Sequence, residues 1–105
     1  MKVFISQPMR GRSDAEIIAE REKIFGDYQA DHPQAELLDS YEAIKKRMGE
    51  YHTYENPRVA MLGEAISTLA DADLVIFAKG WESHPGCRIE EKIATYYDIN
   101  REYVR

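Results

Sequence analysis

The 105 residues of this chain are enough for one domain, because typical domains contain roughly 100–150 residues. Hydrophobic residues make up 44% of the chain and charged residues 31%, a mixture that excludes intrinsically disordered and fibrous proteins. The net charge of −5, with acidic residues in excess in both halves, argues against sequence-independent binding of nucleic acid. We expect a single domain over residues 1–105.

Membrane insertion and metal chemistry are both disfavoured by the residue pattern. The longest apolar run, Leu74 to Ala78, is far shorter than the ~20 residues of a membrane span. Residues 1–3 open a strand-like segment rather than a signal peptide. No metal-ligand spacing connects the single cysteine with the histidines at positions 32, 52 and 84. We therefore expect a cytoplasmic protein without a membrane partner, a metal or a cofactor.

Four segments have the composition of β-strands. Residues 2–6 and 73–78 are almost continuous apolar runs, which is typical of strands buried on both faces of a parallel sheet. Residues 35–39 are a weaker third segment, and residues 102–104 are a short fourth.

Helices are predicted between these strands. Residues 13–16 match the S-x-x-E capping box, so a first helix begins there. Residues 41–48 favour a short helix, and residues 56–57 supply a cap and a first-turn proline for another. The last helix covers residues 86–97 and stops by Asn100. Its expected buried stripe consists of Ile89, Ile93, Tyr96 and Tyr97.

This alternation predicts an α/β protein with a small doubly wound parallel sheet of four or five strands, flavodoxin-like, with helices on both faces. The expected strand order is 2-1-3-4. In such a sheet the ligand crevice lies beyond the carboxyl ends of the strands, where the strand order reverses. Residues 41–55 either cover that crevice or form a solvated connection whose tyrosines pack inward.

The loop after the first strand, residues 6–12, is a candidate anion site. It contains Arg10 and Arg12 but no acid, in a chain that is otherwise acidic. The N–H groups at the start of the next helix, its dipole and a guanidinium together favour a phosphate. The alternative is that Pro8 and Gly11 only shape a turn and that Arg10 is solvated. No dinucleotide-binding fingerprint or P-loop motif occurs.

The second candidate is Glu90, which follows the loop of residues 80–86. Helical geometry makes it the semi-buried acid of its helix, whereas Glu91 points the opposite way. An ionised carboxylate in a partly dry cleft can act as a nucleophile or stabilise a cationic sugar. The alternative is an ordinary first-turn glutamate. Cys87 is expected to face away from Glu90 as a small core residue, and Asp73 to be a turn residue.

Three segments resemble the nucleoside 2-deoxyribosyltransferase superfamily. They are FISQPMRG at residues 4–11, ADLVIF at residues 72–77, and GWES with GCRIE and Ala94 within residues 80–94. The resemblance extends in order along essentially the whole chain. It is closer to a small bacterial and phage branch that is related to the deoxynucleoside 5′-monophosphate N-glycosidases.

The resemblance implies that Glu90 attacks the anomeric carbon of a 2-deoxyribose and expels the base. It also implies a 5′-phosphate held by residues 9–11 and a serine near Ser83. Two positions depart from the pattern: Phe4 stands where a tyrosine is usual, and Ala65, beside Glu64, where an aspartate is usual. Either Glu64 substitutes for that acid or the acid is missing. The expected substrate-binding residues are Ser6, Gln7, Met9, Arg10, Gly11, Asp39, Glu64, Trp81, Ser83 and Gly86.

Two functions follow from these residues. The first is an N-glycosidase or deoxyribosyltransferase that acts on a deoxynucleoside or its 5′-monophosphate. The second is a non-catalytic protein that sequesters or senses a nucleotide. A scaffold role has only the small size in its favour. The expected partner is a small nucleoside or nucleotide, with no nucleic acid, and the resemblance implies a homo-oligomer whose contact involves residues 59–69 or the two tyrosines 96 and 97.

Overall fold

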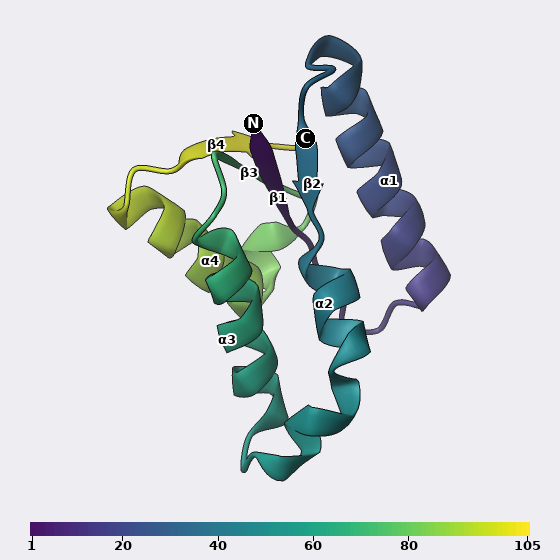
Figure 1. Ribbon diagram of the computed structural model, residues 1–105, viewed down its shortest axis with the longest axis vertical. Coiled ribbons are helices and arrows are strands. Elements are labelled where there is room, and N and C mark those ends of the chain that lie inside the picture. Colours follow the sequence, from purple (N-terminus) through teal and green to yellow (C-terminus); the bar gives the residue numbers. More distant parts are fainter.

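The computed structural model describes residues 1–105 and contains one parallel sheet with the strand order β2-β1-β3-β4 (Figure 1). All three neighbouring pairs of strands are parallel. The predicted strand order is therefore confirmed, and the sheet has four strands rather than five. The strands are β1 (Lys2–Ser6), β2 (Glu36–Leu38), β3 (Leu74–Phe77) and β4 (Asn100–Tyr103).

Helices cover both faces of the sheet, as the alternation of strands and helices predicts. In Figure 1, α1 lies on one side of the strands, and α3 and α4 lie on the other. Two core clusters correspond to these faces: Val3 and Ile5 belong to the first, and Phe4 and Val75 belong to the second. The helices are α1 (Asp14–Asp31), α2 (Ser40–Lys46), α3 (Pro57–Leu69) and α4 (Pro85–Tyr96), with short 3-10 helices η1 (Met48–Thr53) and η2 (Trp81–Ser83).

Side-chain caps fix the starts of three helices. Ser13 and Glu16 form the predicted capping box of α1, since each side chain bonds to the backbone N–H of the other residue. Asn56 accepts from the N–H of Val59 at the start of α3, where Pro57 is the first helical residue. Asp39 caps α2. Caps of this kind contribute roughly 1 kcal/mol each, which favours these boundaries.

The end of α4 differs from the prediction. The helix ends at Tyr96 because Asp98 adopts a left-handed backbone conformation with φ 56°, and Asn100 begins β4 instead of stopping the helix. The expected buried stripe is also wrong, since Tyr96 and Tyr97 are each 76% exposed. The buried residues of α4 are Cys87, Glu90 and Ala94, so the buried stripe is narrow and contains a carboxyl group.

Residues 41–55 form α2 and η1, which lie against α3. Tyr41 and Tyr51 are buried, whereas Tyr54 is exposed. Arg47 connects this segment to α3 through an ion pair with Glu64, with 2.7 Å between Nη1 and Oε2. A second ion pair joins Lys45 to Asp14 of α1 at 3.1 Å, so the segment is fixed to the body of the protein by two inward tyrosines and two ion pairs.

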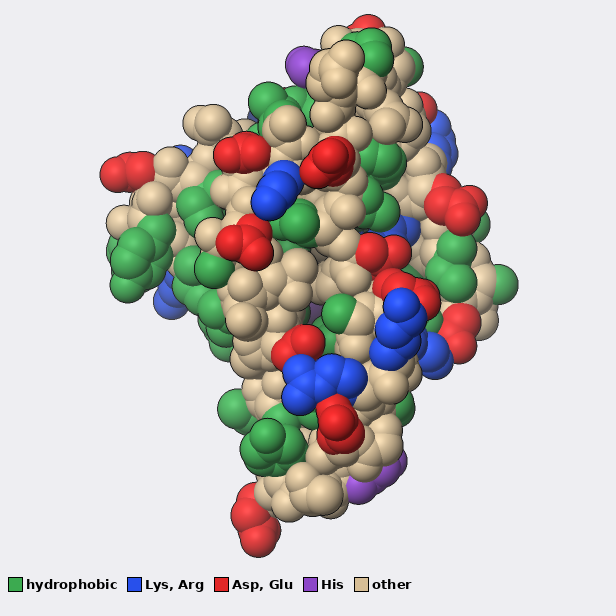
Figure 2. Space-filling model, viewed as in Figure 1, with side chains coloured by type: hydrophobic (Ala, Val, Ile, Leu, Met, Phe, Trp, Pro, Cys, Tyr) green, Lys and Arg blue, Asp and Glu red, His purple; other side chains and the backbone are tan.

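The surface mixes charges of both signs. On the face in Figure 2, lysine and arginine side chains lie among aspartate and glutamate side chains, and no patch of a single sign dominates. None of the helices combines the length and the apolar character that crossing a membrane would require.

Candidate functional site

The carboxyl ends of β1 and β3 meet where the strand order reverses. The chain leaves β1 toward β2 on one side and returns to β3 on the other side, so this is the position at which doubly wound sheets bind ligands. Ser6 pairs with Phe77 at the last register position, and the N–H of Ala78 donates to the Ser6 carbonyl at 2.9 Å. The segments that lead into the two predicted loops, residues 6–12 and 80–86, therefore start at adjacent points.

Glu90 reaches this point from α4. Glu90 is only 6% exposed, and its Oε1 accepts a hydrogen bond of 2.6 Å from the Ser6 hydroxyl. Burial raises the pKa of Glu90 to about 7, because the charged form loses solvation, while the Ser6 hydrogen bond and the positive charge of Arg21 oppose the rise. The carboxyl is more deeply buried than the sequence predicts, and near neutral pH it exists in both protonation states.

Cys87 lies beside the same pair. The thiol is buried and interacts with Ser6 and Glu90, and burial raises its pKa to about 11. The expectation that Cys87 faces away from Glu90 is wrong, because residues three apart are neighbours on one face of a helix. Its interpretation as a small core residue is confirmed, since a buried thiol with a high pKa is a poor nucleophile.

Arg21 is a buried residue of this region that the sequence analysis missed. It lies on α1, is 3% exposed, and donates to Gln7 Oε1 at 2.9 Å and to Ser40 Oγ at 3.2 Å. A signal existed, because Ile17, Arg21 and Tyr28 recur at helical spacing along one face of α1. A charged residue inside an apolar stripe is the pattern that marks a buried polar contact.

Gln7 and Asp39, like Ser6, are expected substrate-binding residues whose side chains have partners within the protein. Gln7 is buried, and its amide nitrogen donates to the Ile17 carbonyl at 2.8 Å and to Glu20 at 2.9 Å. Asp39 accepts from the N–H of Glu42 as the cap of α2, and its Oδ1 lies 3.4 Å from Arg21 Nε. Gln7 thus connects the end of β1 to α1, and Asp39 connects α2 to α1.

The N-terminus of α1 is a poorer anion site than the sequence suggests. Its capping box uses the N–H of Glu16, and its first turn carries the carboxylates of Asp14 and Glu16. Arg12 is engaged as well, by the Pro8 carbonyl at 2.9 Å and by Glu20 at 2.7 Å. These contacts favour the alternative interpretation, in which the segment between β1 and α1 is a structural turn.

The tip of this loop presents one charged group to solvent. Arg10 is exposed and has no side-chain partner in the structure, and Met9 beside it is half-buried. Gly11 has φ 77°, a left-handed conformation that other residues adopt only with strain. The glycine thus turns the chain sharply after Arg10.

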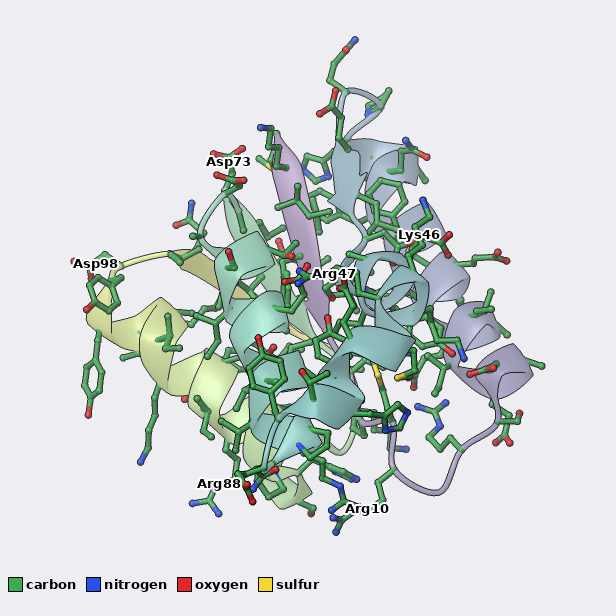
Figure 3. All side chains as sticks on the ribbon, turned by 60° about the horizontal axis from the view of Figure 1, so that its bottom comes forward. Arg10, Lys46, Arg47, Asp73, Arg88 and Asp98 are labelled. Atoms are coloured by element: carbon green, nitrogen blue, oxygen red, sulfur yellow. The ribbon has the colours of Figure 1, made fainter.

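The N-terminus of α4, unlike that of α1, has neither a side-chain cap nor an acid in its first turn. His84 is the residue that precedes the helix. Ser83 is exposed just before this end, and Arg88 follows in the helix. Figure 3 shows Arg10 and Arg88 at the same end of the molecule. Free N–H groups at a helix start favour an anion, so the start of α4 is a better candidate for an anion site than the start of α1.

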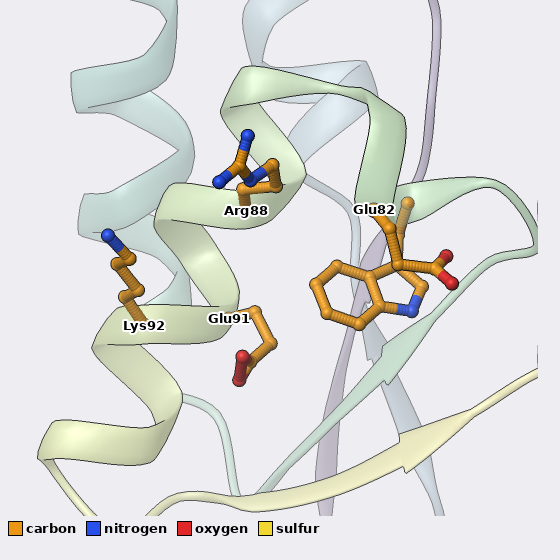
Figure 4. Close-up of a pocket in the computed structure, with 5 residues that line it drawn as sticks. Glu82, Arg88, Glu91 and Lys92 are labelled. Atoms are coloured by element: carbon orange, nitrogen blue, oxygen red, sulfur yellow. The ribbon is translucent and has the colours of Figure 1, made fainter.

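Trp81 lines a different hollow. Its ring packs against Phe77 and Tyr103, with centroids 5.3 Å and 5.5 Å away. It borders an open groove of about 350 Å³ on the outer side of α4 (Figure 4). Glu91, not Glu90, faces this groove and accepts from the Thr95 hydroxyl at 2.7 Å. The groove is completed by Glu82, Arg88 and Lys92.

The two positions that depart from the family pattern are filled by core residues. Phe4 and Ala65 belong to one buried apolar cluster and carry no polar side-chain group. Glu64 is bound to Arg47, and Gly86 faces Leu62 of α3. The structure therefore brings Ser6 to Glu90, and it directs Gln7, Asp39, Glu64 and Gly86 toward other elements of the fold.

Comparison of the chain with protein-family models, with curated proteins and with solved structures finds no match in any of the three. No group of three or more histidine, cysteine or carboxylate side chains is arranged to hold a metal ion. Function is therefore inferred from the Ser6–Glu90 pair and its surroundings.

Proposed function

We propose that the protein cleaves or transfers the N-glycosidic bond of a deoxynucleoside or its 5′-monophosphate, with Glu90 as the nucleophile. The observation that carries this proposal is the buried Glu90 carboxyl, hydrogen-bonded to Ser6 at the point where the strand order reverses. A pKa of about 7 leaves a useful fraction of the carboxylate ionised near neutral pH. The sequence resemblance supports the same residue in the same role.

The chemistry uses two displacements. An oxygen of ionised Glu90 bonds to the anomeric carbon as the bond from that carbon to the base nitrogen breaks, and the base leaves with the electron pair. The glycosyl ester is then attacked by water, or by a second base, and Glu90 returns as a carboxylate. Ser6 orients the carboxylate through its hydroxyl.

The leaving base receives no proton from α3 in this mechanism. Ala65 and Phe4 are buried core residues, and Glu64 is paired with Arg47. No acid from α3 is therefore assigned to protonate the base, and the base takes its proton from solvent. We expect slow turnover and a preference for bases that leave readily.

The substrate class follows from the end of α4. The uncapped helix start, with Arg88 beside it and Arg10 at the same end of the molecule, suits a 5′-phosphate. A monophosphate is thus the preferred form of the substrate, with Ser83 as a further hydroxyl donor.

The second candidate is a protein that binds a nucleotide without cleaving it. It is favoured by the apolar residues at positions 4 and 65 and by the deep burial of Glu90. The two functions differ in one measurement, because a sequestering protein retains the intact nucleotide when it is recovered from the complex.

The decisive experiment incubates the protein with a panel of deoxynucleosides and deoxynucleoside monophosphates and measures the released base by chromatography. Glu90→Gln is expected to abolish release, and Glu91→Gln, the neighbouring acid on the outer face, is the matched control. A 2-fluorinated substrate with a good leaving group should accumulate as added mass on the Glu90 peptide. Equal release by the wild-type protein and the folded Glu90→Gln variant contradicts the proposal.

We further propose that the protein associates with itself through the exposed apolar residues of α3 and α4. Val59 is 62% exposed, and Ile89, Tyr96 and Tyr97 are exposed as well. Sedimentation of the wild-type protein and of Tyr96→Ser, Tyr97→Ser measures this directly, and a monomeric wild-type protein contradicts it.

A further inference from the structure

The guanidinium of Arg21 holds the residues on both sides of Ser6. Its Nη1 donates to the carbonyl of Ile5 at 3.4 Å and to the side chain of Gln7 at 2.9 Å. Ser6, between these two, directs its hydroxyl to Glu90 at 2.6 Å. Arg21 belongs to α1 and Glu90 to α4, so three elements converge on this one hydrogen bond.

The other nitrogens of Arg21 extend the network to α2. Nη2 donates to Ser40 at 3.2 Å, and Nε lies 3.4 Å from Asp39 but makes no hydrogen bond. Burying a guanidinium costs stability unless good partners surround it, and an apolar side chain would serve packing equally well. An arginine with an incompletely bonded nitrogen is therefore poorly explained by packing alone.

We propose that Arg21 is a positioning residue for the Ser6–Glu90 pair: Nη2 is anchored by Ser40, the planar guanidinium thereby holds Nη1 against both neighbours of Ser6, and the Ser6 hydroxyl is aimed at the Glu90 carboxylate. As a contribution to catalysis this rests on the proposed function, whereas the coupling itself is a property of the folded protein. A lysine in this position keeps the charge but has a single nitrogen, so it cannot be anchored by Ser40 and bond to the neighbours of Ser6 from two fixed positions in one plane.

The groups that face Glu90 are the Ser6 hydroxyl from β1, the Cys87 thiol on its own helix and the charge of Arg21 from α1. Arg21 can act on the carboxylate through its charge alone or through Ser6. A charge-conserving substitution separates these routes, because only the second depends on the shape of the guanidinium.

The test titrates Glu90 by carbon-13 NMR of labelled glutamate side chains, with the Glu90 signal assigned by its loss in Glu90→Gln. Arg21→Lys is expected to move the Glu90 midpoint to higher pH, since the Ser6 hydrogen bond to the charged form is weakened. In a Ser6→Ala background the same substitution should produce no further shift. Lys23→Arg, an exposed substitution on the same helix, is the control and should leave the midpoint unchanged.

Ser40→Ala provides a second route if Arg21→Lys does not fold. It removes one anchor of the guanidinium without touching β1 or α4, and a smaller upward shift of the Glu90 midpoint is expected. The proposal is overturned if a folded Arg21→Lys protein titrates like the wild type. It is also overturned if the shift is equally large with and without Ser6, or if the midpoint in Ser40→Ala is unchanged.

Kinetics supply an independent readout. For a substrate that the wild type cleaves, Arg21→Lys should lower kcat about tenfold or more and leave KM nearly unchanged, as expected for a misplaced reacting group. The titration needs no turnover. If the wild-type protein releases no base but Arg21→Lys still produces the Ser6-dependent shift, the proposed function is wrong and the positioning role of Arg21 is retained.

Discussion

The Ser6 hydroxyl and the Glu90 carboxyl, 84 positions apart in the sequence, are joined by a buried hydrogen bond of 2.6 Å. The bond links the last residue of β1 to the middle of α4, across the point where the strand order reverses. The Ser6 hydroxyl donates to the Glu90 carboxylate and so favours the charged form of Glu90, while burial favours the neutral form more strongly. The balance leaves the pKa of Glu90 at about 7.

The pH dependence of turnover should show which form of Glu90 reacts. A nucleophile must be ionised, so kcat/KM should rise with pH and level off above about pH 7. Initial rates of base release between pH 5 and pH 9, with Glu91→Gln as the control, measure this. A rate that instead falls through pH 7 would mean that the neutral carboxyl acts, as a general acid.

The same titration should make folding stability depend on pH. The pKa of Glu90 is raised from the usual 4.5 to about 7 in the folded protein, so the folded state binds this proton more tightly than the unfolded state does. The resulting stabilisation is complete below about pH 4.5 and is lost as the pH rises to about 7, a loss on the order of 3 kcal/mol.

Urea unfolding at pH 4.5, 6 and 8 measures this loss. Glu90→Gln has no such proton to release, so its free energy of unfolding should fall less than that of the wild type over this range. Glu91→Gln keeps the buried acid and should behave like the wild type. Parallel curves for the wild type and Glu90→Gln would show that Glu90 has an ordinary pKa in the folded protein.

Removing the hydroxyl of Ser6 should raise the pKa of Glu90 further. A hydrogen bond to a charged group is worth about 1.5–3 kcal/mol, so Ser6→Ala should lower kcat/KM at pH 7 roughly tenfold and move its rise to higher pH. Much of the loss should be recovered above the new pKa. Ser67→Ala, an exposed serine of α3, is the control. An equal loss at every pH would assign Ser6 to substrate contact instead.

The order of the elements could be predicted because it depends on local patterns. Continuous apolar runs indicate buried parallel strands, and the capping box at Ser13 and the pair Asn56 and Pro57 mark helix starts. The strand order then follows from right-handed crossovers and from the need to cover both faces. Those rules do not involve individual long-range contacts.

The details of the site could not be predicted in the same way. The burial of Glu90 and the neighbourhood of Cys87 depend on how α4 rotates against the sheet, and the exposed Tyr96 and Tyr97 show that hydrophobicity alone gave the wrong rotation. Arg21 was missed because an arginine within an amphipathic helix is normally solvent-exposed. Its partners, Gln7 and Ser40, come from other elements and are not visible in the sequence.

The last prediction concerns recognition of a 5′-phosphate at α4. The uncapped N-terminus of this helix and the guanidinium groups of Arg10 and Arg88 are expected to hold the phosphate. A monophosphate should then bind about tenfold or more tightly than its nucleoside, because a charge-assisted hydrogen bond contributes roughly 1.5–3 kcal/mol. Arg88→Ala and Arg10→Ala should each reduce this preference and leave nucleoside affinity nearly unchanged, since a nucleoside offers these side chains no anion. Arg58→Ala, on α3, is the control. Calorimetric titration with the nonreacting Glu90→Gln protein as background gives all the affinities, and equal binding of nucleoside and monophosphate would assign these arginines to solubility rather than to recognition.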